Sequence, residues 1–122
     1  MRFLRQHHIS FKNALSGLKW AFTTQPNFRV HFSLAFLAVL LAFILSVSYL
    51  EMTILILTIA FCLGIEMVNT SIEAMTDLIT TKWASQAKIA KDVAAGMMLL
   101  TAFGSVIVAM FIFLPKIWRL LS

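Results

Sequence analysis

The hydrophobic and polar positions of the chain divide into one short amphipathic segment followed by three long apolar runs. In the first segment, residues 10–24, Phe11, Leu15, Leu18 and Phe22 recur at helical spacing, with lysines on other faces. The three apolar runs predict helices at about 28–49, 52–78 and 88–114. Each is long enough to cross about 30 Å of hydrocarbon. The pattern therefore predicts an all-α membrane protein with an N-terminal amphipathic surface helix and three transmembrane helices.

The second predicted span carries a polar stripe in its second half. Glu66, Asn69, Glu73 and Asp77 follow one another at steps of three, four and four, which places them within about 80° of a helix surface. A carboxylate at bilayer depth costs roughly 2.5 to 3.5 kcal/mol, so three of them would cost on the order of 10 kcal/mol if they faced lipid. We therefore expect the stripe to face protein or water.

Composition supports a single integral-membrane domain over residues 1–122. The chain is 61% hydrophobic and 12% charged, which lies outside the range of soluble globular proteins. Cys62 is the only cysteine, so the chain has no intrachain disulfide and no cysteine-based zinc site. Neither a P-loop nor a dinucleotide-binding glycine motif nor a nucleophile elbow occurs in the sequence. These absences exclude soluble nucleotide-binding architectures, but they leave nucleotide chemistry open.

The basic residues are distributed unequally between the two ends of the predicted spans. Two of them, Lys116 and Arg119, follow the last span. Eight lie before the first span or between the second and third: Arg2, Arg5, Lys12, Lys19, Arg29, Lys82, Lys88 and Lys91. By the positive-inside rule this predicts a cytoplasmic N-terminus. The acidic end of the stripe and Lys91 would then meet at the cytoplasmic interface, where soluble nucleotides and metal ions are available.

The residue types of the stripe suit phosphoryl transfer. That reaction needs a base for the attacking hydroxyl, carboxylates for a metal ion and a cation over the transferring phosphate. Glu66, Glu73 and Asp77 supply the first two, and Lys91 supplies the third. Glu66 lies deepest in the membrane and is the expected general base. Oxygen donors without thiolates favour Mg²⁺ or Mn²⁺ over zinc.

Three other interpretations of the stripe compete with phosphoryl transfer. It could hold helices together, or it could carry ions or protons through a small oligomeric transporter. It could also belong to a non-catalytic assembly factor. Against transport, the first and third spans and the outer half of the second are apolar, so no polar path reaches the far side of the membrane.

Several motifs resemble one family of bacterial membrane enzymes. The segment E-M-V-N-T-S-I-E-A-M-T-D is followed by A-K-I-A-K-D-V-A-A-G, and F-K-N-A-L-S-G-L-K-W-A-F and T-Q-P-N-F-R-V-H precede them. Together they are similar to the prokaryotic diacylglycerol kinase and undecaprenol kinase family of small membrane lipid kinases. The resemblance covers roughly residues 10–116.

The resemblance implies a homotrimeric bundle with composite active sites at the cytoplasmic interface. It implies that Glu66 is the catalytic base and that Glu73 is a metal ligand. Many members have Glu at the position of Gln25, where it is a second metal-binding carboxylate, and Gln25 offers a neutral oxygen instead. The nucleotide-binding residues that the resemblance implies are Ala14, Gly17, Asn69, Glu73, Asp77, Lys91 and Asp92.

The implied reaction transfers the γ-phosphate of ATP, with Mg²⁺, to a membrane lipid alcohol. Diacylglycerol, giving phosphatidic acid, is the first acceptor, and undecaprenol, giving undecaprenyl phosphate, is the alternative. The expected partners are the lipid, ATP and further copies of the chain, with no nucleic acid, at the bacterial inner membrane. We expect the lipid in a groove between the surface helix and the second and third spans.

Overall fold

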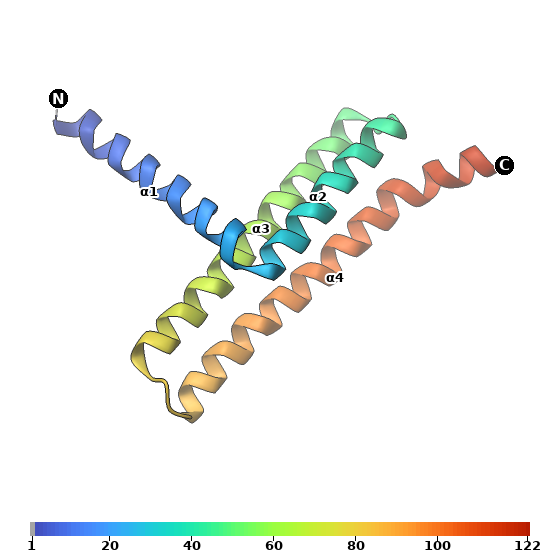
Figure 1. Ribbon diagram of the computed structural model, residues 1–122. Helices are drawn as coiled ribbons and strands as arrows, with labels where there is room; N and C mark the ends of the chain where they lie inside the picture. The colour runs from blue at the N-terminus through green and yellow to red at the C-terminus, as the bar shows by residue number, and fades with distance from the viewer. Residues whose placement is uncertain (1) are drawn as a thin grey trace.

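The computed structural model describes residues 2–122, with side chains described from residue 9 onward. The side chains of Arg2 and Arg5, which entered the charge count, lie outside the described part. Within the described residues the chain forms four helices, α1 (Arg2–Thr24), α2 (Pro26–Ile44), α3 (Tyr49–Ile79) and α4 (Ser85–Leu121) (Figure 1). The last three are long and apolar enough to cross a membrane. This confirms the predicted all-α class and its three candidate spans.

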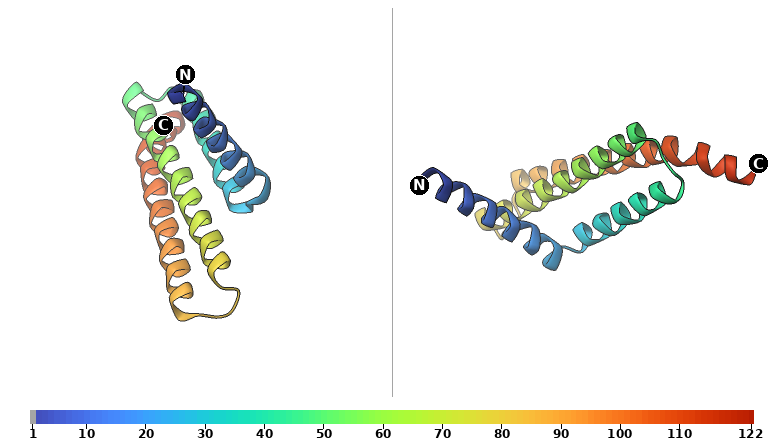
Figure 2. Two further views of the ribbon diagram at one scale, coloured as in Figure 1. Left: turned by 90° about the vertical axis from the view of Figure 1, so that its left-hand side faces the viewer. Right: turned by 90° about the horizontal axis from the view of Figure 1, so that it is seen from above.

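Helices α3 and α4 run antiparallel and form the most extensive helix pair of the chain. Helix α2 packs mainly on α3, and α1 contacts α2 only near the point where the two helices join. Figure 2 shows α1 leaving the other three helices at an angle, while α2 diverges from the α3–α4 pair away from its turn into α3. The polar stripe therefore lies on α3, which belongs to the helix pair with the most extensive contacts.

The hydrophobic core lies at the end of the molecule where α2 turns into α3. Ala42, Leu55, Ile112 and Phe113 form a buried cluster from α2, α3 and α4. Because lipid removes the hydrophobic driving force between membrane helices, close contacts of this kind hold the three helices mainly by van der Waals packing.

Hydrogen bonds and an ion pair close the same end. Ser48 caps α3: its hydroxyl accepts from the Glu51 amide at 3.3 Å, and its own amide donates to Glu51 Oε2 at 2.6 Å. This capping box satisfies two backbone donors at the helix start. Lys116 of α4 then pairs with Glu51 Oε2 at 3.0 Å. The side chains of Ser48, Glu51 and Lys116 are thus paired with one another within one chain.

The helices differ from the predicted bounds most at three points: α1 begins at Arg2 and not at residue 10, and α2 and α4 end at other residues than predicted. Helix α2 ends at Ile44, because the chain turns through Ser46, with a φ of 50°, to reach the capping box of α3. Helix α4 continues through Pro115 to Leu121, whereas the third predicted span ends at about residue 114. A proline removes one backbone hydrogen bond, and a helix in an apolar environment keeps its remaining bonds because no water replaces them.

The corner between α1 and α2 is packed by aromatic side chains. Pro26 occupies the first turn of α2, where its missing N–H costs no helical hydrogen bond. The rings of Phe22 and Phe32 meet edge to face with centroids 5.3 Å apart. Ala21 and Phe28 are buried beside them. These contacts fix the C-terminal end of α1 against α2 and shape the groove described below.

Candidate functional site

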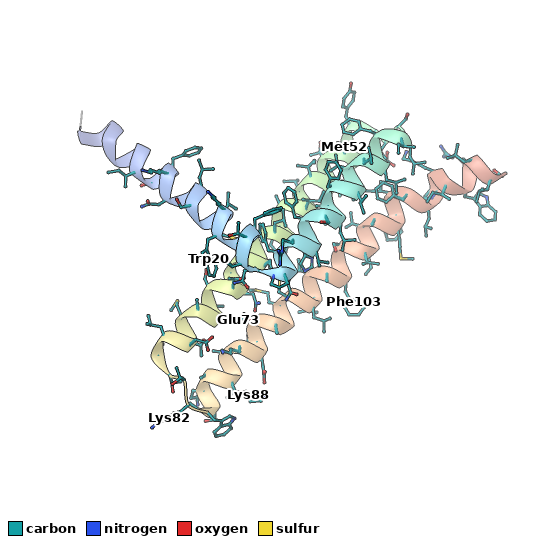
Figure 3. All side chains as sticks on the ribbon, in the orientation of Figure 1. Trp20, Met52, Glu73, Lys82, Lys88 and Phe103 are labelled. Carbon is teal, nitrogen blue, oxygen red and sulfur yellow. The ribbon has the colours of Figure 1, made fainter. Side chains whose placement is uncertain are left out.

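The polar stripe of α3 passes from the interior of the chain to its surface. Glu66 and Asn69 are buried, with only 3% and 7% of their surface exposed, whereas Glu73 and Asp77 are exposed. In Figure 3, Glu73 lies on α3 between the α1–α2 corner and the loop that carries Lys82. The inner half of the stripe therefore faces protein, as predicted, and the outer half is open in a single chain.

The antiparallel pairing of α3 and α4 brings a lysine to the stripe. Lys91 Nζ of α4 lies 2.5 Å from Asp77 Oδ1 of α3. The small residue Ala94, which is 2% exposed, lies one turn further along α4 and permits this close approach. Asp92 does not reach the stripe, because it pairs with Lys88 one turn earlier on its own helix. Of the predicted Lys91-Asp92 pair, one chain thus brings only Lys91 to the stripe.

Asn69 leaves one polar atom without a partner in the centre of the site. Its Nδ2 donates to Glu73 Oε1 at 3.2 Å. Its Oδ1 is buried and has no hydrogen-bond partner among the described residues. A buried acceptor left in this state costs about 1 to 3 kcal/mol. A cation or donor that reached Asn69 Oδ1 would recover that cost.

A titratable side chain that was not assigned to the site acts on Glu66 from the first span. His31 of α2 and Glu73 of α3 both interact electrostatically with the Glu66 carboxyl group. His31 is not among the site residues that the sequence predicted. The signal in the sequence was that His31 is the only strongly polar residue between Val30 and Tyr49, because a titratable side chain in an apolar span is expected to face protein.

The oxygen donors suit a magnesium nucleotide better than a free metal ion. No group of three His, Cys, Asp or Glu side chains that could hold a metal occurs within the described residues. Mg²⁺ commonly binds one or two carboxylates together with substrate phosphates. Glu73, with the unpaired Asn69 Oδ1 beside it, fits that requirement.

The predicted metal partner Gln25 stands apart from Glu73 in the single chain. It occupies the N-cap position of α2, and its Nε2 donates to Thr24 Oγ1 at 3.4 Å. Among the described side chains, no hydrogen bond or ion pair joins Gln25 to the stripe. Its role as a ligand stays a prediction.

The two predicted nucleotide contacts on α1 face open space. A Cβ atom built at Gly17 would meet no atom within 4 Å, and Ala14 is exposed. In the part of the chain that the structure describes, no hydrogen bond or ion pair connects Ala14 or Gly17 with α3. One chain alone does not bring them to Glu73 or Lys91, so their assignment also stays a prediction.

An apolar groove of about 570 Å³ lies at the junction of α1, α2 and α3. This groove lies against the first and second spans, whereas the predicted lipid groove lies against the second and third, and the site of the lipid stays a prediction. The groove reaches Met67, the residue next to Glu66. Its lining residues are Leu18, Lys19, Phe22, Thr23, Phe28, Phe32, Ala60, Leu63, Gly64 and Met67.

Comparison with known families assigns the chain. Residues 12–113 match the model of the prokaryotic diacylglycerol kinase family. The chain belongs to this family. The match covers the polar stripe, Lys91 and all the residues that line the groove, and it confirms both the family and the lipid kinase class that the sequence motifs indicated.

Individual relatives include kinases of two lipid acceptors. The chain is 38% identical over 114 residues to an undecaprenol kinase of Bacillus subtilis, covering 93% of both proteins. It is 36% identical over 114 residues to a diacylglycerol kinase of Synechocystis sp., covering 93% of this chain but 65% of that protein. A diacylglycerol kinase of Helicobacter pylori is 37% identical over 84 residues, which are 69% of this chain and 66% of that protein. The chain therefore spans about two thirds of these two diacylglycerol kinases.

Proposed function

We propose that this protein transfers the γ-phosphate of MgATP to the hydroxyl group of a membrane lipid alcohol. The observation that carries the proposal is the placement of a polar stripe inside apolar helices. Its buried end, Glu66, lies next to a residue of the apolar groove, and its exposed end meets Lys91. A lipid hydroxyl and a nucleotide can thus approach the stripe from different sides.

The roles of the side chains follow from their surroundings. Glu66 accepts the proton of the lipid hydroxyl, since it is the most buried carboxylate of the stripe. Lys91 supplies positive charge for the nucleotide phosphates, and Asp77 holds the ammonium group in place until the nucleotide arrives. Asn69 orients Glu73 through its amide hydrogen bond.

Glu73 and Asn69 Oδ1 would hold the magnesium ion that accompanies ATP, with Gln25 as a further oxygen donor. When bound, Mg²⁺ neutralises charge on the phosphate oxygens. A neutral amide at residue 25 provides less negative charge than a carboxylate would. We therefore expect this protein to bind Mg²⁺ more weakly than a relative with Glu at that position.

We further propose that the protein is a homotrimer in the bacterial inner membrane, with α1 on the cytoplasmic surface. The exposed Glu73 and the open faces at Ala14 and Gly17 support an oligomer, because each would gain protein neighbours from a second copy. The excess of basic residues at this end of the spans supports the cytoplasmic orientation. Composite sites between copies would bring α1, Gln25 and Asp92 to the nucleotide.

Diacylglycerol, which gives phosphatidic acid, is the first proposed acceptor. Undecaprenol is the second, and one observation favours it: the undecaprenol kinase of Bacillus subtilis matches this chain over 93% of its own length, against 65% for the diacylglycerol kinase of Synechocystis. Both lipids present a hydroxyl group on an apolar tail, and the groove lining is suited to either tail.

The test is ATP consumption by the purified protein in bicelles, with diacylglycerol and undecaprenol supplied side by side. We expect ADP release that depends on one of the two alcohols and on Mg²⁺. Ion flux in liposomes is measured in parallel. Flux without alcohol-dependent ADP release would favour a transporter and refute the kinase proposal. Neither activity would favour an assembly factor.

A further inference from the structure

The groove at the α1–α2–α3 junction has a single charged lining side chain, Lys19. Thr23 is the only other polar side chain of the lining, and its hydroxyl donates to the carbonyl oxygens of Lys19 and Trp20. None of the ion pairs among the described side chains involves Lys19. The groove therefore combines an apolar wall with one positive charge that the chain itself does not balance.

The position of Lys19 on α1 separates it from the face proposed for the nucleotide. At 3.6 residues per turn, Lys19 lies about 140° from Ala14 and about 160° from Gly17 around the helix. It lies about 60° from Phe22 and about 100° from Leu18 around the helix, so it borders the apolar face of α1 that these two groove residues occupy. Lys19 is an exposed residue that lines both this groove and the neighbouring cavity on α1, on the side of the helix away from Ala14 and Gly17.

We propose that Lys19 binds the phosphomonoester group of the lipid product. This inference rests on the proposed function, in which a neutral alcohol enters the groove and a lipid phosphate leaves it. A phosphomonoester carries a charge of about −1.5 to −2 at neutral pH, whereas the acceptor hydroxyl carries none. Since the tail contacts are the same for both lipids, Lys19 makes the groove bind the product more tightly than the acceptor.

This role has a kinetic consequence. An enzyme whose groove favours the product is inhibited by that product, and its turnover falls as lipid phosphate accumulates in the surrounding bilayer. Replacing Lys19 with an uncharged residue removes the preference without changing the apolar walls of the groove. The product then leaves more readily, and inhibition by added lipid phosphate becomes weaker.

Lys12 provides a matched control on the same helix. It lies seven residues from Lys19, on nearly the same face. Both lysines line the neighbouring cavity on α1, but only Lys19 also lines the groove. A basic residue near a membrane attracts anionic lipids in a general way, at about 1 kcal/mol per residue. Lys12→Gln and Lys19→Gln remove the same charge from α1, so a difference between them reports the groove itself.

The experiment measures equilibrium binding of dioctanoyl phosphatidic acid and dioctanoylglycerol to the full-length protein in zwitterionic bicelles. We expect Lys19→Gln to weaken phosphatidic acid binding about fivefold, as for a partly exposed charge pair. Lys19→Arg keeps the charge and is expected to stay within about twofold of the wild type, as is Lys12→Gln. Binding of the neutral dioctanoylglycerol is expected to be the same in all four proteins.

Equal weakening by Lys12→Gln and Lys19→Gln would overturn the proposal, because the effect would then be general membrane electrostatics. Unchanged phosphatidic acid binding in Lys19→Gln would overturn it as well. MgATP binding is measured on the same samples. A loss of MgATP affinity without a loss of phosphatidic acid affinity would assign Lys19 to the nucleotide instead. A wild type without alcohol-dependent ATP use would refute the kinase proposal separately, whatever the binding results.

Discussion

The two ends of the α3–α4 pair differ in how completely one chain satisfies its polar groups. At the end with the α2–α3 turn, Ser48, Glu51 and Lys116 are paired with one another in a capping box and an ion pair, next to the buried cluster around Ala42. At the opposite end, Asn69 Oδ1 is buried without a partner in the described part of the chain, and Glu73 is exposed.

The difference in pairing distinguishes polar groups that stabilise the fold from polar groups that are available to a ligand. Polar groups that one chain satisfies stabilise the fold and have no capacity left for a ligand. Polar groups that remain unmatched inside apolar helices cost free energy, and we expect them where a ligand or a second copy of the chain completes them. Changes at the stripe should therefore affect turnover, whereas changes at the capped end should affect stability.

The largest effect is expected from Glu66→Gln. Losing a general base lowers the rate by roughly 10² to 10⁴, so we expect kcat to fall by about 10³ with little change in KM for ATP. The measurement is lipid-dependent ADP release in bicelles. Glu51→Gln, at the capped end, is the control and is expected to retain the wild-type kcat. A Glu66→Gln protein with nearly full turnover would remove Glu66 as the base.

A second comparison uses two lysines on α4. Lys91 contacts Asp77 of the stripe, whereas Lys88 pairs only with Asp92 on its own helix. We expect Lys91→Gln to lower kcat/KM for ATP about 100-fold, since a charge aimed at transferring phosphate contributes several kcal/mol. Lys88→Gln is expected to change it by no more than about threefold. Similar losses of kcat/KM in both variants would show that the contact of Lys91 with Asp77 does not give Lys91 a special role in ATP use.

A substitution at residue 25 tests which residues bind the metal. If Gln25 faces the metal in the oligomer, Gln25→Glu adds a hard anionic oxygen and should tighten Mg²⁺ binding several-fold. The readout is the Mg²⁺ concentration that gives half-maximal turnover, with Asn27→Asp as a control that adds the same charge two residues away. Equal shifts in the two variants, or none, would exclude Gln25 as a ligand.

The smallest effect is expected at the capped end. Ser48→Ala removes the N-cap of α3 and should lower stability by about 1 kcal/mol, which is seen as a Tm lower by several degrees. The specific activity of the folded protein is expected to remain that of the wild type. A variant with normal Tm and impaired turnover would contradict the division between the two ends.

The helices and the stripe could be predicted from the sequence because both follow from hydropathy and helical period. Glu66 and Asn69 are buried as the cost of exposing them to lipid requires. Contacts between helices were less predictable. Asp92 turns to Lys88 because an i, i+4 partner is always within reach on a helix, whatever the neighbouring helix offers.

The position of the groove could not be predicted either. It depends on the angle between α1 and α2, which the Phe22–Phe32 contact and the short link at Gln25 set together. The sequence does contain one signal for Lys19: it lies next to Leu18 and three residues before Phe22, so it borders the apolar face of α1. The sequence around Pro115 contains no such signal that α4 continues to Leu121.

The most direct test follows the phosphate itself. Wild-type protein, Glu66→Gln and Glu51→Gln are incubated in bicelles with γ-labelled ATP and dioctanoylglycerol, or with the same lipid whose hydroxyl is capped as a methyl ether. For the wild type and Glu51→Gln, we expect label in the extracted lipid only when the lipid has a free hydroxyl group. For Glu66→Gln we expect almost no label in the lipid. A parallel series uses undecaprenol in place of dioctanoylglycerol. Label found only as inorganic phosphate with both lipids, or equal transfer by Glu66→Gln, would contradict the account.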